Sequence, residues 1–136
     1  MKELTLQAIT ANIPQVTAFI DEQLEAADCP MKAQMQIDVA IDELFGNIAH
    51  YAYAPDTGDA TVRFELDEAL RMATITFLDS GVPFNPLEKE DPDVSLPASE
   101  RQIGGLGIFM VKKSMDNVQY AYLDGKNILT LTKKIV

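Results

Sequence analysis

Hydrophobic residues recur at helical spacing in three parts of the chain. The clearest pattern covers residues 31–53, where no proline interrupts the segment and apolar positions follow i, i+3, i+4, i+7 and i+11. Similar patterns predict a helix over 13–27, with Asn12 as its N-cap, and another over 108–115. The apolar stripe of the longest helix consists of Ile37, Ala40, Ile41, Leu44 and Ile48.

Other segments alternate between apolar and polar residues or are rich in β-branched residues, which is typical of β-strands. Short turns at 67–70 and at Asp124-Gly125 join two pairs of them into expected antiparallel hairpins. This order of elements lacks the alternation of parallel α/β folds. It predicts an α+β fold, a two-layer sandwich in which helices cover one face of a mostly antiparallel, mixed sheet. The predicted strands are residues 3–9, 61–66, 71–78, 118–123 and 128–135.

A long segment without regular structure is predicted between the last two hairpins. Residues 79–103 contain four of the seven prolines, together with many acidic and small residues. Loops of this length inside a compact domain are uncommon and usually serve as lids or binding loops. We therefore predict a lid over 88–103.

The composition limits the classes of function. A chain of 136 residues suits one domain, residues 1–136, because domains commonly have about 100–200 residues. The formal net charge of −10 disfavours nucleic-acid binding through a basic surface. Any bound phosphate would have to rely on backbone N–H groups, a metal ion and a few local cations.

Cys29 is the only cysteine, which excludes an internal disulfide framework and a zinc site made of several thiolates. The start of the chain lacks signal-peptide features, and no segment reaches the roughly 18 apolar residues of a membrane span. We therefore expect a cytoplasmic protein that does not bind membranes. The methionines at apolar positions are expected to fill the core, namely Met31, Met35, Met72, Met110 and Met115.

Three polar residues lie on one face of the longest predicted helix. Glu43, Asn47 and His50 follow one another at i, i+4 and i+7 and border the apolar stripe, where the wall of a cleft would run. Gly46 lowers helix stability by about 1 kcal/mol relative to alanine, and Asn47 lowers it less. Because the sequence accepts this cost, we favour a functional role for the polar flank of the helix, formed by Glu43, Asn47 and His50. The alternative is that these residues form an ordinary solvated helix surface. His50 is expected to pack against its neighbours or to support a site residue, rather than to act as an acid or base.

Asp79, Ser80 and Gly81 directly follow an apolar strand. Such a sequence often forms a simple turn. The alternative is a binding role, in which the Asp79 carboxylate accepts a hydrogen bond from the amino group of a base such as adenine. Gly81 would then leave room for the ring.

A glycine cluster, Gly104-Gly105-Leu106-Gly107, precedes the last predicted helix. Glycines permit close backbone approach, and the N-terminus of a helix offers unpaired N–H groups, so the combination suits a phosphate. The cluster lacks the Walker pattern, and no strand directly precedes it as in a Rossmann fold. A flexible helix entry is the alternative.

Together, these features resemble the GHKL ATPase superfamily and, within it, the anti-sigma factor serine/threonine kinase group. The resemblance rests on the N box IDELFGNIAH at 41–50, the adenine box DSGVPFNP at 79–86 and the phosphate box IGGLGI at 103–108. Pro83 stands where many members have a second glycine. The spacing between the basic residue Arg101 and the glycines also differs from that in some members. The resemblance implies a Bergerat-type ATP-binding fold.

By this resemblance, Asn47 would ligate a Mg²⁺ ion that bridges the phosphates of ATP, and Glu43 would act as the general base. Asp79 and Gly81 would bind adenine. A hard oxygen ligand beside a carboxylate agrees with phosphoryl transfer to a hydroxyl group. The residues that would bind the phosphates and line the lid are Gly104, Gly105, Leu106 and Gly107.

The resemblance implies an ATP-dependent serine/threonine protein kinase that phosphorylates a small anti-sigma antagonist protein. It leaves open a further role in sequestering a sigma factor, and a homodimer, since homodimers are common in this group. The alternative is a regulatory module that binds nucleotide and a partner protein without phosphotransfer. Glu43 favours the enzyme, because a pure binding module needs no base beside the metal site.

Overall fold

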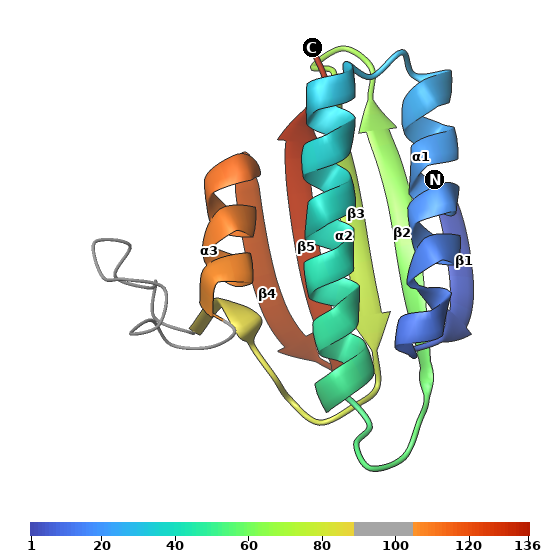
Figure 1. Cartoon of the computed structure of the whole chain (residues 1–136), viewed down its shortest axis with the longest axis vertical. Coiled ribbons are helices and arrows are strands. Elements are labelled where there is room, and N and C mark those ends of the chain that lie inside the picture. Colours follow the sequence, from blue (N-terminus) through green and yellow to red (C-terminus); the bar gives the residue numbers. More distant parts are fainter. Residues whose placement is uncertain (89–104) are drawn as a thin grey trace.

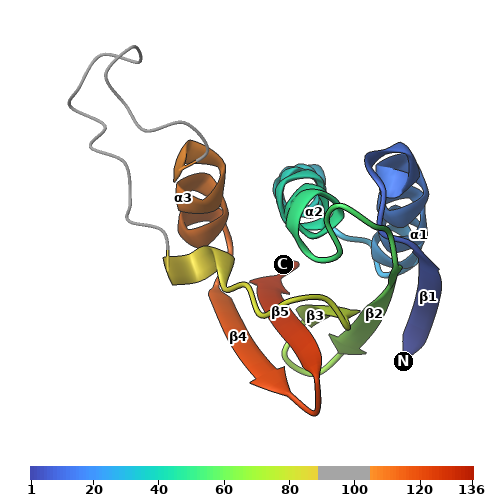
Figure 2. The same cartoon turned by 90° about the horizontal axis from the view of Figure 1, so that it is seen from below.

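The computed structural model describes residues 1–88 and 105–136. In this part of the chain, three α-helices lie on one face of a five-stranded β-sheet (Figure 1 and Figure 2). The predicted α+β fold is confirmed. No described helix is long and apolar enough to cross a membrane. The elements are β1 (Lys2–Gln7), a 3-10 helix (Thr10–Asn12), α1 (Ile13–Ala26), α2 (Met31–Tyr51), β2 (Asp59–Asp67), β3 (Met72–Asp79), a 3-10 helix (Pro86–Glu88), α3 (Gly105–Ser114), β4 (Asn117–Leu123) and β5 (Lys126–Lys134).

The strands of the sheet follow the order β1-β2-β3-β5-β4, and every neighbouring pair is antiparallel. Both predicted hairpins are present, as β2–β3 and β4–β5. In the second hairpin, Asp124 and Gly125 have φ angles of 53° and 75°, the left-handed conformation that a tight turn of this type requires. The pairing of β3 with β5 joins segments far apart in the sequence and sets Asp79 opposite Asn127.

The core lies between the helices and the sheet. The predicted apolar stripe of α2 is buried, and α1 and α3 add shorter buried stripes on either side of it (Figure 1). Alternate residues of β2, β3 and β5 face the helices, while the opposite, threonine-rich face of the sheet is less buried. Burying one large apolar side chain contributes about 1.5–3 kcal/mol. The largest fully buried side chains include Phe45, Phe77, Ile20, Leu24, Ile37 and Ile41.

The start of α1 differs from the prediction. Asn12 precedes the helix, but its side chain makes no capping hydrogen bond, and its Nδ2 atom donates to the carbonyl oxygen of Gln7 at 2.9 Å. Asn12 ends a 3-10 turn and has a helical backbone conformation, whereas a typical N-cap has an extended one. Asn12 therefore ties the helix to β1.

Three methionines that were expected in the core lie on the surface instead. Met31, Met35 and Met110 are 68%, 60% and 52% exposed. Met115 is buried as predicted, and Met72 is half-buried. Because each helical residue turns by about 100°, Met31 and Met35 fall outside the buried stripe of α2 although they are apolar.

Two aspartates from neighbouring helices interact between α1 and α2. Asp21 and Asp38 each have a buried Oδ1 atom that lacks a hydrogen-bond donor among the described residues. The pKa of Asp38 is raised to about 7, and burial of the carboxyl is the largest cause. Asp21 contributes as a hydrogen-bond partner of the protonated form and as a negative charge, and Glu25 has a smaller effect. Protonation of Asp38 supplies the missing donor to the pair.

We expect the Asp38 carboxyl to make the free energy of unfolding fall as the pH rises from about 4 to about 7. In this interval the folded chain holds a proton on Asp38 that the unfolded chain has released, so deprotonation favours unfolding. Asp38→Asn keeps a donor without a charge and should therefore flatten the pH dependence and raise stability above pH 7. Urea titrations across this interval measure the effect.

The matched control for this prediction is Asp42→Asn, which removes an exposed carboxylate from the same helix and should leave the slope unchanged. If Asp38→Asn has the same slope as the parent protein, the carboxylates do not share a proton.

Candidate functional site

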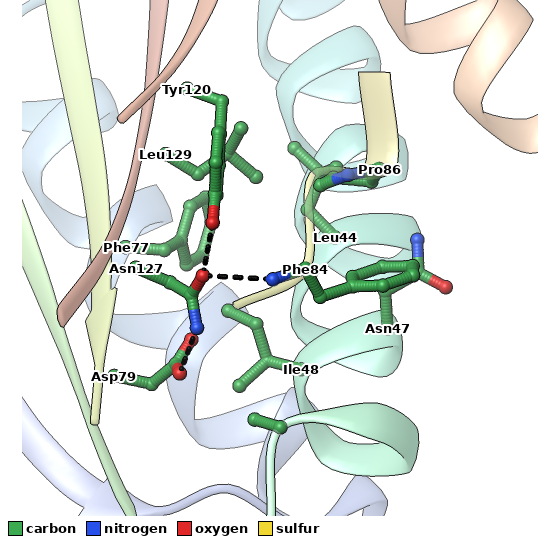
Figure 3. A pocket seen from close by; sticks show the side chains of 11 residues that line it. Leu44, Asn47, Ile48, Phe77, Asp79, Phe84, Pro86, Tyr120, Asn127 and Leu129 are labelled. Atoms are coloured by element: carbon green, nitrogen blue, oxygen red, sulfur yellow. Dashed lines mark hydrogen bonds between the residues drawn. The ribbon is translucent and has the colours of Figure 1, made fainter. Parts of the chain in front are cut away.

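A pocket lies between the C-terminal half of α2 and the ends of β3 and β5 (Figure 3). Its walls are mainly apolar, and a few polar side chains from α2, β3, β4 and β5 reach it. An apolar pocket with few, well-placed polar groups suits a flat ligand such as a purine base. The lining residues are Leu44, Asn47, Ile48, Ala52, Phe77, Asp79, Phe84, Pro86, Tyr120, Asn127 and Leu129.

Asp79 is the last residue of β3 and is only 5% exposed. It faces the helices because it continues the alternation of the buried positions along the strand. Its Oδ1 atom accepts two hydrogen bonds, from Nδ2 of Asn127 at 2.9 Å and from the N–H group of Gly81 at 2.9 Å. No described residue donates to Oδ2, so this oxygen is an available acceptor.

Asn127 lies opposite Asp79, and its side-chain amide makes four hydrogen bonds. Figure 3 shows those with Asp79, Phe84 and Tyr120. Its Nδ2 atom donates to Asp79 and to the carbonyl oxygen of Val82 at 2.8 Å. Its Oδ1 atom accepts from the N–H group of Phe84 at 3.1 Å and from the Tyr120 hydroxyl group. Four hydrogen bonds are the full capacity of an amide. Asn127 therefore holds both the Asp79 carboxylate and the chain that follows β3.

The Tyr120 hydroxyl group serves as a donor in this network. Burial raises the pKa of the Tyr120 phenol, an effect that a backbone hydrogen bond at Phe84 reduces and the negative charge of Asp79 reinforces. Because its pKa lies above the ordinary tyrosine value, Tyr120 stays protonated at neutral pH. The neutral phenol is therefore the donor of the hydrogen bond to Oδ1 of Asn127.

The turn after β3 packs against the end of α2. The N–H group of Val82 donates to the carbonyl oxygen of Ala52 at 2.8 Å, and a side chain at Gly81 would overlap the same carbonyl group. The N–H group of Ser80 donates to the Tyr53 hydroxyl group at 2.8 Å. Glycine at position 81 therefore permits a close approach of two backbone segments, which fixes the turn beside Asp79.

Glu43 and Asn47 lie one turn apart on α2, near the pocket. Asn47 lines the pocket, and its Nδ2 atom is buried without a hydrogen-bond partner among the described residues. The Glu43 carboxylate lies against Gly107 of α3, where any side chain would overlap it. The packing of α3 beside α2 thus brings Glu43 and Gly107 together.

The structure places the predicted site residues as follows. Gly105 and Leu106 begin α3, whereas Gly104, Arg101 and most of the predicted lid lie outside the described residues. His50 is exposed and lines no part of the pocket. The residues gathered at the pocket and its α3 side are Glu43, Asn47, Asp79, Gly81 and Gly107.

Asn127, Tyr120 and Phe84 also shape the pocket but were not predicted from the sequence. Asn127 carries a detectable signal, because the alternation along β5 puts it on the same face as the buried Leu129 and Leu131. A polar residue at such a position must find hydrogen-bond partners. Tyr120 and Phe84 carry no comparable signal, since their roles depend on where β5 and the turn after β3 meet.

These residues fit a magnesium–nucleotide complex. Oδ2 of Asp79 is available for the amino group of a base, and the apolar walls suit its ring. The buried Nδ2 of Asn47 has no acceptor among the described residues, and a phosphate oxygen would supply one. The Oδ1 of the same amide is a hard oxygen of the kind that Mg²⁺ prefers, and Mg²⁺ commonly takes few protein ligands beside phosphates and water.

Two glycines should respond differently to alanine. Gly46→Ala should raise the free energy of unfolding by about 1 kcal/mol, because alanine favours helix and no atom outside the helix's own nearby backbone lies within 4 Å of the added methyl group in the described chain. Gly107→Ala brings the same helix preference but must displace the Glu43 carboxylate, so its net gain should be smaller or negative. Thermal unfolding of both variants measures the difference.

The double variant Glu43→Ala, Gly107→Ala removes the overlap and should restore the gain at position 107. Equal stabilisation by Gly46→Ala and Gly107→Ala would contradict the contact between Glu43 and Gly107.

The sequence is similar to those of known proteins. Residues 6–133 match the Histidine kinase-like ATPase domain. The chain is also 34% identical over 101 residues to proteins named Serine-protein kinase RsbW from Bacillus thuringiensis (strain Al Hakam), Bacillus mycoides (strain KBAB4) and Bacillus cereus (strain AH820). The match covers 71% of this chain and 61% of each relative. The chain thus spans less than two thirds of the length of these relatives.

The matched family covers nearly the whole chain, including the pocket, the polar flank of α2 and the start of α3. The resemblance to GHKL ATPases that the three sequence boxes indicated is therefore confirmed. The chain belongs to the histidine kinase-like ATPase domain family.

Proposed function

We propose that this chain is an ATP-dependent protein serine/threonine kinase that transfers the γ-phosphoryl group of ATP to a hydroxyl group of a partner protein. The observation that supports it most is the state of the Asp79 carboxylate. Two hydrogen bonds hold Oδ1, and no described residue donates to Oδ2 in a largely apolar pocket. A fixed, buried acceptor of this kind favours a base with an exocyclic amino group.

The placement of Asp79 supports the binding of adenine. Its Oδ2 atom would accept a hydrogen bond from the 6-amino group, while Leu44, Ile48 and Phe77 would contact the faces and edges of the ring. Guanine presents a carbonyl oxygen at that position, and an oxygen beside the carboxylate would be repelled. The Asn127 amide contributes by holding Asp79 in one orientation, so the carboxylate need not be reorganised on binding.

Asn47 is proposed to bind the magnesium ion and the phosphates. Its Oδ1 atom would ligate Mg²⁺, and its Nδ2 atom would gain the acceptor that it lacks. Magnesium, when bound, neutralises the negative charge that develops on the phosphate oxygens during transfer. The glycines at the start of α3 would provide backbone N–H groups to the phosphates, as the resemblance implies.

Glu43 is proposed to act as the general base. It lies one helical turn from Asn47 and against Gly107 at the start of α3, a position that would suit a base beside the phosphates rather than beside adenine. As the hydroxyl oxygen of the partner attacks the γ-phosphorus, its proton passes to Glu43. The bond between the γ-phosphorus and the bridging oxygen breaks, and ADP leaves with that electron pair. A positioned base typically accelerates such a step about 10²- to 10⁴-fold.

The partner is proposed to be a small anti-sigma antagonist protein, with a sigma factor as a second binding partner and the cytoplasm as the location. The support is the resemblance to the anti-sigma factor kinase group and the similarity to relatives named serine-protein kinases. A homodimer is part of the same proposal.

Asp79→Asn tests the recognition of the base. The substituted amide keeps an oxygen for Asn127 and Gly81, so the fold should remain stable. It puts an N–H donor where Oδ2 was, which repels the amino group of adenine. Affinity for Mg-ATP should fall about tenfold or more, equivalent to about 1.4 kcal/mol, and the preference for ATP over GTP should shrink.

The measurement is a thermal unfolding series with each nucleotide, because a ligand at a hundredfold excess over its dissociation constant stabilises a protein by about 2.7 kcal/mol. Asp59→Asn, at an exposed position, is the control. Equal stabilisation of the parent and Asp79→Asn by Mg-ATP would contradict the proposal.

Glu43→Gln and Asn47→Ala should separate catalysis from binding. Glu43→Gln keeps the size of the side chain and removes its basicity, so nucleotide affinity should stay within a few-fold while phosphotransfer falls about 10²-fold or more. Asn47→Ala removes a group used in both ground and transition states, so binding and transfer should fall together. Labelled-phosphate assays with candidate antagonist proteins, together with nucleotide titrations, measure both quantities.

Asp42→Asn serves as the control on the same helix, because this exposed carboxylate does not line the pocket. Full transfer by Glu43→Gln would remove Glu43 as the base. Nucleotide binding without transfer to any candidate partner would favour the alternative, a regulatory module that binds nucleotide without phosphotransfer.

A further inference from the structure

An apolar groove lies between α2 and α3, far along α2 from the nucleotide pocket. Met31, Met35 and Val39 follow one another at i, i+4 and i+8 and are 68%, 60% and 59% exposed. Met110 of α3 is 52% exposed. The two helices lie side by side on the same face of the sheet (Figure 1 and Figure 2). The groove is lined by Met35, Gln36, Val39, Met110 and Ser114.

A basic depression adjoins this groove. It is lined by the side of α2 near its N-terminus and the end of β5, and it contains Lys32, Lys133 and Lys134. Gln36 lines both hollows, so they form one continuous surface. Nζ of Lys133 donates to the carbonyl oxygen of Ser114 at 2.7 Å, which connects the basic end to the wall of the groove. We call the two hollows together the α2–α3 surface.

The charge of this surface is unusual for the chain. Three of the eleven lysines and arginines line one depression, although the formal net charge of the chain is −10. Asp116 lies nearby, where its carboxylate accepts a hydrogen bond from the N–H group of Lys134 at 2.5 Å, and it offsets part of the positive charge. The lysines therefore form a positively charged patch on a protein whose net negative charge otherwise repels acidic ligands.

We propose that the α2–α3 surface is a docking site for an acidic amphipathic helix of a partner protein. A groove between two helices accepts the apolar face of a third helix whose anchors recur at i, i+3 or i+4 and i+7. Methionine side chains are flexible and polarizable, so they adapt to the anchors of the incoming helix. Acidic residues on that helix would pair with the lysines and set its direction in the groove.

Charge distinguishes this occupant from a second copy of the chain. A second copy bound at this surface would have to bring one of its own acidic segments to Lys32, Lys133 and Lys134 while its apolar side chains fill the groove. The α2–α3 surface and the nucleotide pocket use different parts of α2. The pocket uses α2 from Leu44 onward, whereas the groove and depression use α2 up to Val39. Docking is therefore expected with or without nucleotide.

The probe is a labelled helical peptide with leucines at i, i+3, i+4 and i+7 and glutamates flanking this stripe. Two control peptides carry lysines in place of the glutamates, or the same residues in scrambled order. Binding is measured by fluorescence anisotropy and by NMR of the methionine methyl groups. The methyl signals of Met35 and Met110, which line the groove, should shift, while the signal of the buried Met115 should not.

Matched variants assign the binding to this surface. Met35→Ser and Lys32→Glu should each weaken binding of the acidic peptide about tenfold. Leu123→Ser changes a residue that is also 60% exposed but lies in the β4–β5 hairpin, and Lys2→Glu reverses a lysine on β1. Both controls should change the affinity by less than about twofold. Circular dichroism confirms that each variant is folded.

Three results would overturn the proposal. The first is equal binding of the acidic and the lysine-substituted peptides, which would remove the role of the lysines. The second is binding that the control variants weaken as much as the surface variants. The third is a shift of the same methyl signals when the protein concentration is raised without peptide, which would assign the surface to a second copy of the chain.

Discussion

Burial of one face of α2 against the sheet sets the position of every functional feature of this chain. The stripe from Ile37 to Ile48 must face the sheet, and this fixes the rotation of α2 about its own axis. The directions of all its other side chains follow from that rotation. One side places Glu43 and Asn47 near the pocket and α3. Another places Asp38 against α1, and the outer side leaves Met35 on the surface. A rotation of the helix would lose the core and all three arrangements together.

The register of the sheet carries a second constraint, because the pocket depends on the pairing of Asp79 with Asn127. A slip of one residue between β3 and β5 would move one of these side chains to the opposite face. The same slip would expose Phe77 or Leu129, which neighbour them in the core. The apolar packing therefore selects the register, and the hydrogen bonds of Asn127 follow from it. Leaving Asn127 unmatched would cost about 1–3 kcal/mol for each buried group that lost its partner.

How much the sequence predicts depends on how local the signal is. The α2 stripe and the Asp124-Gly125 turn are encoded by adjacent residues, and both were predicted correctly. The contact between Asp79 and Asn127 joins residues that are distant in the chain, and no periodicity indicates that β5 is the neighbour of β3. The exposed Met35 was misjudged because apolarity alone does not say which side of a helix is covered. Sheet order and helix neighbours, which decide such cases, arise only when the whole core assembles.

The α3 helix takes part in both surfaces of this chain, which has a mechanical consequence. Gly107 contacts the Glu43 carboxylate, and Met110 and Ser114, one and two turns further along, line the groove. Between them, Ile108 and Val111 fix the helix in the core. Because a helix moves as a rigid unit over such a short length, a partner that shifts α3 at the groove also shifts Gly107 relative to Glu43. Coupling of the two surfaces then requires that the partner and the nucleotide each prefer one position of α3, and its strength is limited by the smaller of these two differences in affinity.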